Sequence, residues 1–277
     1  MTIGQNAVRS FTSRPLALDS GALLGGLLAG IFLPSEWLIY AFVIAGQAHF
    51  FMAYLYQYRG GKMGSSYFLM GGVLLVGAFA YLYFLGEQGV WAFLLVAFLF
   101  PIHFALDEVH LHGNTLNTRS AGTVAGFSLL VFATVLIYAF PETELLYAAV
   151  AAVFFCGALV RIFLRKETLT RSEVYLWVTG VVVMLLAYFG RPEQALSIII
   201  LLHGLNWCIG YGARLKGQGE KEKEYWLLTF ITLGVSLLAF IGFTSLAIEP
   251  LRYFFLVFYY DLWAIAHVVL SFRFWRA

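Results

Sequence analysis

The stretch FPIHFALDEVHLHG, residues 100–113, gathers three of the chain's six histidines and two adjacent carboxylates at the end of an apolar run. Imidazole and carboxylate groups bind metals and transfer protons. Asp107 follows His103 by four residues, so both side chains project from one face of a helix. A carboxylate placed there can accept the spare N–H of a metal-ligating histidine, the usual supporting arrangement, or can ligate the metal directly. The spacing indicates a metal site in which Asp107 has a catalytic, supporting role.

Four histidines lie inside long apolar segments of the chain, namely His49, His103, His203 and His267. A single histidine in such a segment is more often a hydrogen-bonded core residue than a ligand. Ionisable groups within a bilayer are costly and usually face an interior site, so four of them on four segments favour a shared role. Neutral imidazoles that converge in a dry interior suit a transition metal such as iron. We therefore predict that these four histidines are the ligands of one metal.

The segments that must position these histidines are membrane spans. With 61% hydrophobic and 12% charged residues, the chain carries more apolar surface than a soluble domain of 277 residues can bury. About 20 apolar residues cross a bilayer as a helix. The sequence predicts an all-α integral membrane protein, a single helical domain over 1–277, and about ten spans (eight to ten): 17–33, 36–56, 66–85, 89–106, 121–140, 144–163, 173–189, 195–212, 225–246 and 251–272. Nothing in the composition indicates a nucleic-acid partner.

The basic residues predict the orientation of these spans. Ten spans place 15 of the 17 Lys and Arg residues on one side and leave Arg191 and Arg252 on the other. Basic residues concentrate on the cytoplasmic side of membrane proteins, so we expect a multi-pass protein of the cell inner membrane with both termini in the cytoplasm. The four histidines then stand 7, 3, 9 and 5 residues before the cytoplasmic ends of their spans. These counts correspond to roughly 5 to 14 Å, a single layer in the cytoplasmic half of the membrane.

Other polar residues have simpler interpretations. Glu108, His110 and His112 lie at or beyond the predicted water boundary, where a solvated polar loop and a gating or second-metal role are both open. Asn206, one turn after His203, is placed to orient that histidine. Asp261 lies nearer the middle of the last span and on a different face from its histidine.

Two further patterns concern packing and solvation. The spacings Gly21-x-x-x-Gly25 and Gly26-x-x-x-Gly30 are typical of close helix packing in membranes. The charged run RLKGQGEKEKEYW, residues 214–226, indicates a solvated cytoplasmic loop.

The histidine motifs resemble those of the Brp/Blh family of membrane β-carotene dioxygenases. IHFALDE (102–108) is similar to the family's I-H-F-x-x-x-D motif, and AIAHVVLSFRFWR (264–276) to its closing segment. AGQAHFFMAY (45–54) and LLHGLNW (201–207) occupy the places of its first and third histidine motifs, although the first lacks the family's Asp and the third has Trp207 in place of a second histidine. The resemblance implies Fe²⁺ held by the four histidines, with O₂ as co-substrate and cleavage of a carotenoid to retinal.

Three functions remain open on the residues alone. The first is a membrane non-haem iron oxygenase that acts on a long apolar, lipid-soluble substrate. The second is a b-type cytochrome or electron-transfer subunit in which paired histidines hold haem b. The third is a non-catalytic or transport subunit whose buried histidines relay protons.

Overall fold

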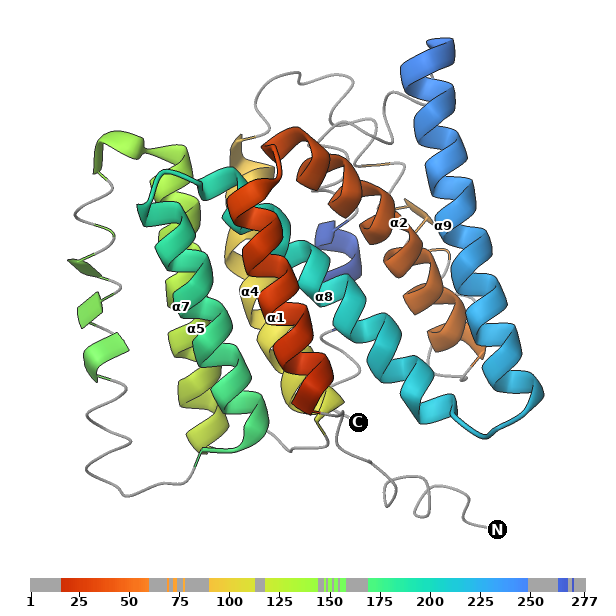
Figure 1. Ribbon diagram of the computed structural model, residues 1–277, viewed down its shortest axis with the longest axis horizontal. Coiled ribbons are helices and arrows are strands. Elements are labelled where there is room, and N and C mark those ends of the chain that lie inside the picture. Colours follow the sequence, from red (N-terminus) through yellow and green to blue (C-terminus); the bar gives the residue numbers. More distant parts are fainter. Residues whose placement is uncertain are drawn as a thin grey trace. The chain divides into compact units, whose positions relative to one another are not determined.

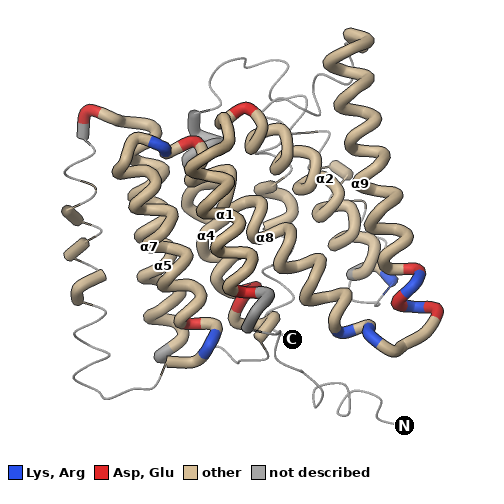
Figure 2. The backbone as a smooth tube through the Cα atoms, viewed as in Figure 1, with Lys and Arg blue, Asp and Glu red and all other residues tan. Residues whose placement is uncertain are grey.

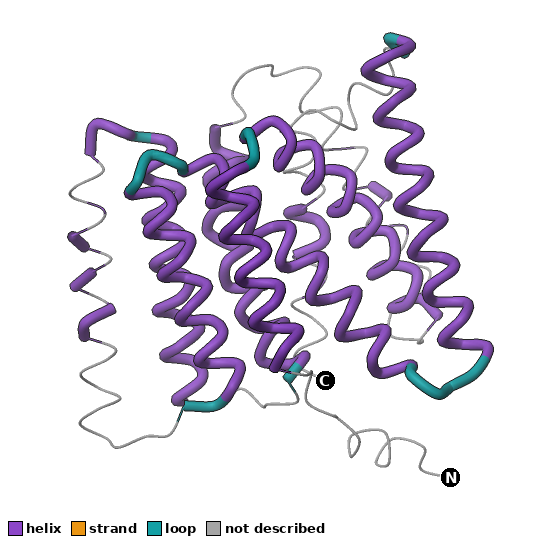
Figure 3. The backbone as a smooth tube through the Cα atoms, viewed as in Figure 1, coloured by secondary structure: helices purple, strands orange, loops and turns teal. Residues whose placement is uncertain are grey.

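The structure is a computed structural model that describes residues 16–59, 90–112, 118–143, 169–248 and 264–268, with isolated positions between these segments. Every element in the described segments is helical, as Figures 1 and 3 show. The elements are α1 (Leu16–Phe32), α2 (Ser35–Arg59), α4 (Val90–Leu111), α5 (Thr118–Ala139), the 3-10 turn η1 (Pro141–Thr143), α7 (Arg171–Tyr188), α8 (Pro192–Leu215) and α9 (Glu220–Leu246). The predicted all-helical class is thereby confirmed for the described part of the chain.

Five of the described helical segments are long and apolar enough to cross a membrane: Ser35–Tyr56, Ser120–Ala139, Arg171–Tyr188, Pro192–Leu215 and Glu220–Leu246. A shorter apolar helix covers Asp19–Phe32. The predicted spans 66–85, 144–163 and 251–272 lie mostly outside the described residues. The count of about ten spans therefore stays a prediction.

Asp, Glu, Lys and Arg residues lie at or near the ends of the described helices, whose central parts are without them, as Figure 2 shows. Arg59 ends α2, and Arg171 begins α7. A bilayer provides no water to solvate a charge in the middle of a helix, so this distribution fits helices that cross lipid.

The turn between α7 and α8 shows how the sequence ends a span. Gly190 adopts a left-handed φ of 78°, a conformation that costs little only for glycine. Its N–H donates to the Ala187 carbonyl at 3.0 Å, and the Arg191 N–H donates to the Leu186 carbonyl at 2.9 Å. These two bonds are the Schellman pair that closes a helix C-terminus. Pro192 then starts α8, so the two helices run antiparallel through a three-residue connection.

The chain divides into two compact units. Unit 1 comprises Met1–Leu38 and Phe104–Lys223, and unit 2 comprises Ile39–His103 and Glu224–Ala277. The division falls within α4, so His103 belongs to unit 2 and the residues that follow it belong to unit 1.

Unit 1 is held together by aromatic and small side chains between its helices. The Phe104 and Phe127 rings stack with centroids 5.1 Å apart. Gly126 of α5 lies directly against the Trp177 ring of α7. Gly180 of α7 in turn lies against α5, because a Cβ there would meet a Leu130 methyl at 2.9 Å. Glycine at these crossings lets the helix backbones approach closely.

The glycines of α1 behave in two ways. A Cβ at Gly26 would meet an Ile198 methyl at 3.0 Å, and Gly30 lies even closer to the same side chain. Gly21 and Gly25 meet no such atom within 4 Å in the described part of the chain. Of the two predicted glycine spacings, it is therefore Gly26-x-x-x-Gly30 that packs closely against α8.

Unit 2 is built around α2 and α9. Tyr40 contacts Phe240 with ring centroids 4.8 Å apart, and Tyr56 contacts Tyr225 at 5.4 Å. Higher residue numbers in α2 thus meet lower numbers in α9, so the two helices are antiparallel. Large apolar side chains of α9 remain exposed, including Phe230 at 66%. Such a surface is stable in lipid and would be costly in water.

Candidate metal centre

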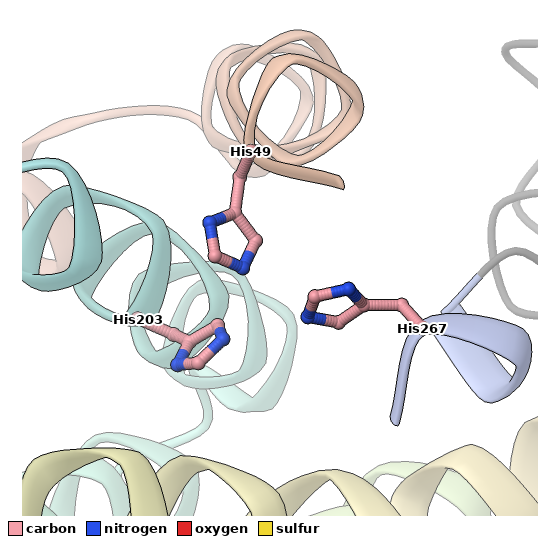
Figure 4. A group of neighbouring side chains, drawn as sticks. All are labelled: His49, His203 and His267. Carbon is pink, nitrogen blue, oxygen red and sulfur yellow. The ribbon is translucent and has the colours of Figure 1, made fainter. Parts of the chain in front are cut away.

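Three of the predicted ligands come together in unit 2. His49 lies in α2, His103 lies in α4, and His267 lies in the helical segment 264–268. Their side chains are buried, with 1%, 1% and 3% of each residue exposed. His103 Nε2 is 3.2 Å from His267 Nε2. The His267 ring also meets the His49 ring edge to face, with centroids 5.0 Å apart, and Figure 4 shows these two rings turned toward one another.

The 3.2 Å contact restricts the protonation of this histidine cluster, by which we mean His49, His103 and His267. A hydrogen bond between two imidazole nitrogens needs one donor and one acceptor. One Nε2 in the pair is therefore without hydrogen, and its lone pair accepts the N–H of the other ring until a metal takes the place of that hydrogen. A neutral imidazole with a free lone pair is the form that binds metals.

The walls of the cluster are aromatic and apolar. The Phe50 ring lies 4.8 Å from the His267 ring, and the Tyr54 ring meets it edge to face at 5.9 Å. The neighbouring Ala48, Met52 and Ala53 side chains are buried as well. Burial of three imidazoles in such surroundings is costly unless their polar atoms find partners.

The spacing of the nitrogens fits a common metal ligand set. Two imidazoles bound about 2.0–2.1 Å from one tetrahedral metal have nitrogens about 3.3 Å apart. His103 and His267 already lie at 3.2 Å. The ligand nitrogens of His49 and His267 lie within 4.8 Å of each other. These side chains can therefore bind a metal, and imidazole donors suit iron, zinc, copper or nickel.

The fourth predicted ligand, His203, belongs to unit 1, where it lies in α8 and is 3% exposed. Its Nε2 is 3.7 Å from Asp107 Oδ2, and its ring lies 5.5 Å from that of Phe104. Figure 4 labels His203 on α8. The 3.7 Å separation is longer than a direct hydrogen bond but places a carboxylate beside the imidazole. The supporting role predicted for Asp107 thus has a specific histidine neighbour in unit 1.

The structure gives the positions of three of the histidines along their helices. His49, His103 and His203 stand 10, 8 and 12 residues before the last residues of α2, α4 and α8. These counts correspond to about 12 to 18 Å along the helix axes, and each helix continues past its apolar run, so the predicted depth in the membrane stays a prediction. The spread among the three remains about one turn. A single four-histidine centre stays a prediction, with three members in unit 2 and one in unit 1.

The sequence left two interpretations of Glu108, His110 and His112 open, a solvated polar loop and a gating or second-metal role. Helix α4 continues to Leu111, and Glu108 is fully buried within it, so Glu108 does not lie in a solvated loop. His112 is also buried, whereas His110 is exposed. Asn206 Nδ2 donates to Glu108 Oε1 at 2.8 Å, although the two residues stand 98 positions apart in the sequence.

Asn206 therefore has partners that sequence reasoning did not identify. Its amide nitrogen donates to Glu108 and, at 2.7 Å, to the Tyr175 hydroxyl. Near these residues Asp19 of α1 forms an ion pair with Arg171 of α7 at 2.8 Å. A lone Asp near the start of an apolar helix was the available signal. Asp261 lies outside the described residues.

The resemblance to the Brp/Blh family rests on short motifs around the histidines. In the structure these motifs lie in α2, α4, α8 and the segment 264–268, which are all helical. In a comparison with known proteins, no family model, curated protein or solved structure matches this chain.

Proposed function

We propose that the protein is a membrane-embedded non-haem iron oxygenase that activates O₂ against a long apolar, lipid-soluble substrate. The observation that carries the proposal is the buried cluster of His49, His103 and His267, with 3.2 Å between two ligand nitrogens. Three neutral nitrogen donors on three separate segments leave coordination positions for substrate or O₂, as catalytic metal sites require. His203 is the proposed fourth ligand on the sequence pattern alone.

Iron is the proposed metal because the reaction needs a redox-active ion that histidines can hold. The donor set contains imidazoles and no thiolate in the described part of unit 2, which suits Fe²⁺ as well as zinc. When bound, the iron supplies the electrons that O₂ activation requires. The resemblance to the carotenoid dioxygenases adds the substrate class, a carotenoid cleaved to retinal.

The protein's own residues position the reactants and exclude water. Phe50 and Tyr54 line the histidine cluster, so a polyene chain can lie against aromatic faces instead of water. Asp107 stands beside His203 and is proposed to hold the orientation of that imidazole. The substrate reaches such a site from the bilayer, into which the exposed apolar side chains of the helices project.

The alternative of a bis-histidine haem is less compatible with the cluster. Haem iron takes its two axial histidines from opposite faces, so their nitrogens lie about 4 Å apart with the porphyrin plane between them. His103 Nε2 and His267 Nε2 are 3.2 Å apart, closer than the two axial nitrogens of one haem would lie. The arrangement favours two neighbouring ligands of a small ion.

The proposed location is the cell inner membrane with both termini in the cytoplasm. It rests on the distribution of 15 and 2 basic residues between the two predicted sides.

The test is metal content, absorption and product formation with protein purified from membranes. We expect non-haem iron without a Soret band, and retinal after incubation with β-carotene and O₂. His49→Ala, His103→Ala and His267→Ala should each remove the iron, whereas His110→Ala, an exposed histidine on the same helix as His103, should retain it. His203→Ala decides whether the fourth ligand belongs to the set. A Soret band, or full iron in two of the three cluster variants, overturns the proposal.

A further inference from the structure

Four ionisable side chains from three elements meet in unit 1. They are Asp19 of α1, Glu108 of α4, His112 just after α4, and Arg171 of α7. His112 Nε2 is 3.3 Å from Asp19 Oδ2, and His112 Nδ1 is 3.7 Å from Glu108 Oε2. Arg171 contacts the same Asp19 oxygen through Nε at 2.9 Å and through its terminal nitrogen at 2.8 Å. We call these four residues the charged cluster.

Hydrogen-bond chemistry fixes the protonation of His112. Its Nδ1 lies 2.8 Å from the main-chain oxygen of Glu108, and a carbonyl oxygen can only accept, so Nδ1 carries a hydrogen. Its Nε2 faces Asp19 Oδ2, which already accepts from the Arg171 guanidinium. A carboxylate paired with arginine is ionised and also only accepts, so Nε2 carries a hydrogen as well. His112 is therefore an imidazolium in this arrangement.

The charges of the cluster cancel only in that state. Asp19 and Glu108 are negative, and Arg171 and His112 are positive. Glu108 is fully buried, so its charge requires a nearby cation as well as the hydrogen bond from Asn206. The Tyr175 ring, 6.2 Å from the His112 ring, adds a neutral neighbour.

The environment of His112 favours the protonated imidazole. Burial alone lowers the pKa of this imidazole, but the hydrogen bond to Asp19 and the charge of Glu108 raise it by more, so the pKa lies above its usual value. The stability contributed by this proton is present at and below the ordinary histidine pKa, and it is lost as the pH rises through the higher value of the folded protein.

We propose that His112 is a proton-binding site that attaches the N-terminal end of α1 to the end of α4, within unit 1. With the proton bound, His112 bridges Asp19 of α1 and Glu108 of α4. Without it, a nitrogen lone pair faces the Asp19 carboxylate, and the contact becomes repulsive. The other end of α1 does not depend on this proton, because Arg191 donates to the Gly30 carbonyl at 3.2 Å. Arg171 holds Asp19 in either state, so proton binding adds a second attachment at one end of α1, a property beyond the proposed oxygenase.

The first experiment measures the proton directly. Full-length protein with ¹⁵N-labelled histidine is placed in lipid nanodiscs, and the His112 nitrogens are assigned by comparison with His112→Gln. At pH 7 we expect both His112 nitrogens to be protonated in the wild type and in the control Glu36→Gln, which changes an exposed acidic residue in the first turn of α2. Asp19→Asn should shift the titration of His112 to lower pH. A neutral His112 at pH 7 in the wild type, or a titration that Asp19→Asn leaves in place, overturns the proposal.

The second experiment measures the attachment of α1. Backbone amide exchange over residues 16–32 is compared at acidic and alkaline pH after correction for the intrinsic exchange rate. In the wild type we expect the first turns of α1 to exchange several-fold faster at alkaline pH, while the turns around Gly30 change little. His112→Gln should remove this pH dependence. Corrected exchange that is equal at both pH values in the wild type, or unequal in His112→Gln, contradicts the role of the proton.

Discussion

Replacement of Asn206 by Ala removes two hydrogen bonds that connect three helices of unit 1. Asn206 is 1% exposed, and its amide nitrogen donates to Glu108 Oε1 at 2.8 Å and to the Tyr175 hydroxyl at 2.7 Å. These bonds connect α8 to α4 and to α7. The substitution leaves a fully buried carboxylate with one hydrogen-bond donor fewer.

The expected loss follows from the two bonds taken separately. A hydrogen bond to a charged group contributes about 1.5–3 kcal/mol. A neutral hydrogen bond between membrane helices contributes about 0.6 kcal/mol on average and about 1.7 at most. His112 continues to stabilise Glu108 in the variant. The loss should therefore lie in the lower part of the range that is obtained by adding the two contributions. We expect the free energy of unfolding to fall by about 2–4 kcal/mol.

The assay is reversible unfolding in mixed micelles of a mild and a denaturing detergent, monitored by helix content. A double-mutant cycle with Tyr175→Phe isolates the neutral bond, for which we expect a coupling of about 0.6–1.7 kcal/mol. The control is Ser128→Ala. That hydroxyl donates at 2.8 Å to the Val124 carbonyl, which belongs to its own helix, so its loss leaves no charge without a partner.

One result would refute this reasoning. If Asn206→Ala lowered the free energy of unfolding by no more than Ser128→Ala does, Glu108 would not depend on Asn206 for its buried charge. The carboxyl group would then be neutral or stabilised by other groups, and the argument from charge balance in unit 1 would fail with it.

Three further outcomes follow from the structure. Gly126→Ala should destabilise the protein by about 1–3 kcal/mol, because its methyl group would overlap the Trp177 ring, whereas Gly25→Ala, at an open position, should not; thermal unfolding of both variants checks this. Asp107→Asn should lower metal affinity about 10–100-fold without abolishing binding, as measured by metal titration, because the role proposed for this carboxylate, which lies 3.7 Å from His203 Nε2, is to support a ligand. Reporter fusions at the C-terminus and near Glu142 should lie on opposite sides of the membrane. If both reported the same side, the predicted number of spans between them would be wrong by an odd number.

The helices could be predicted from the sequence because a bilayer leaves the backbone few alternatives. Unsatisfied peptide groups are costly in lipid, so an apolar run of sufficient length must be helical. Pro34 and Gly190 mark two of the breaks correctly, because proline cannot continue a helix and glycine accepts the left-handed conformation that ends one. The end of α4 could not be predicted in the same way. Glu108, near that end, is buried against a partner in another helix, and Asn206 gives no local sign that it will meet Glu108.

The same distinction applies to the candidate site: some of its residues could be recognised from the sequence, and others only from partners that the fold brings to them. His49, His103 and His267 were identifiable because an imidazole within an apolar span is costly and therefore conspicuous, and the structure brings these three together. Asp19 and Arg171 were not recognised, although each stands within four residues of a helix start. Charges at such positions are ordinarily solvated. Only the fold shows that these two pair with each other.

The histidine cluster and the charged cluster should respond differently to substitution, because the first buries imidazoles and the second buries paired charges. Removal of one imidazole from the histidine cluster leaves no uncompensated charge, so its main effect should be on metal content. Removal of one member of the charged cluster leaves an unbalanced buried charge, which typically costs about 3–5 kcal/mol. Removal of an opposite pair, as in Asp19→Asn with Arg171→Gln, should cost less than the two single changes together, because the remaining charges of Glu108 and His112 still cancel. Metal content therefore reports on the histidine cluster, and a charged-cluster variant that still folds should keep its metal while it loses stability.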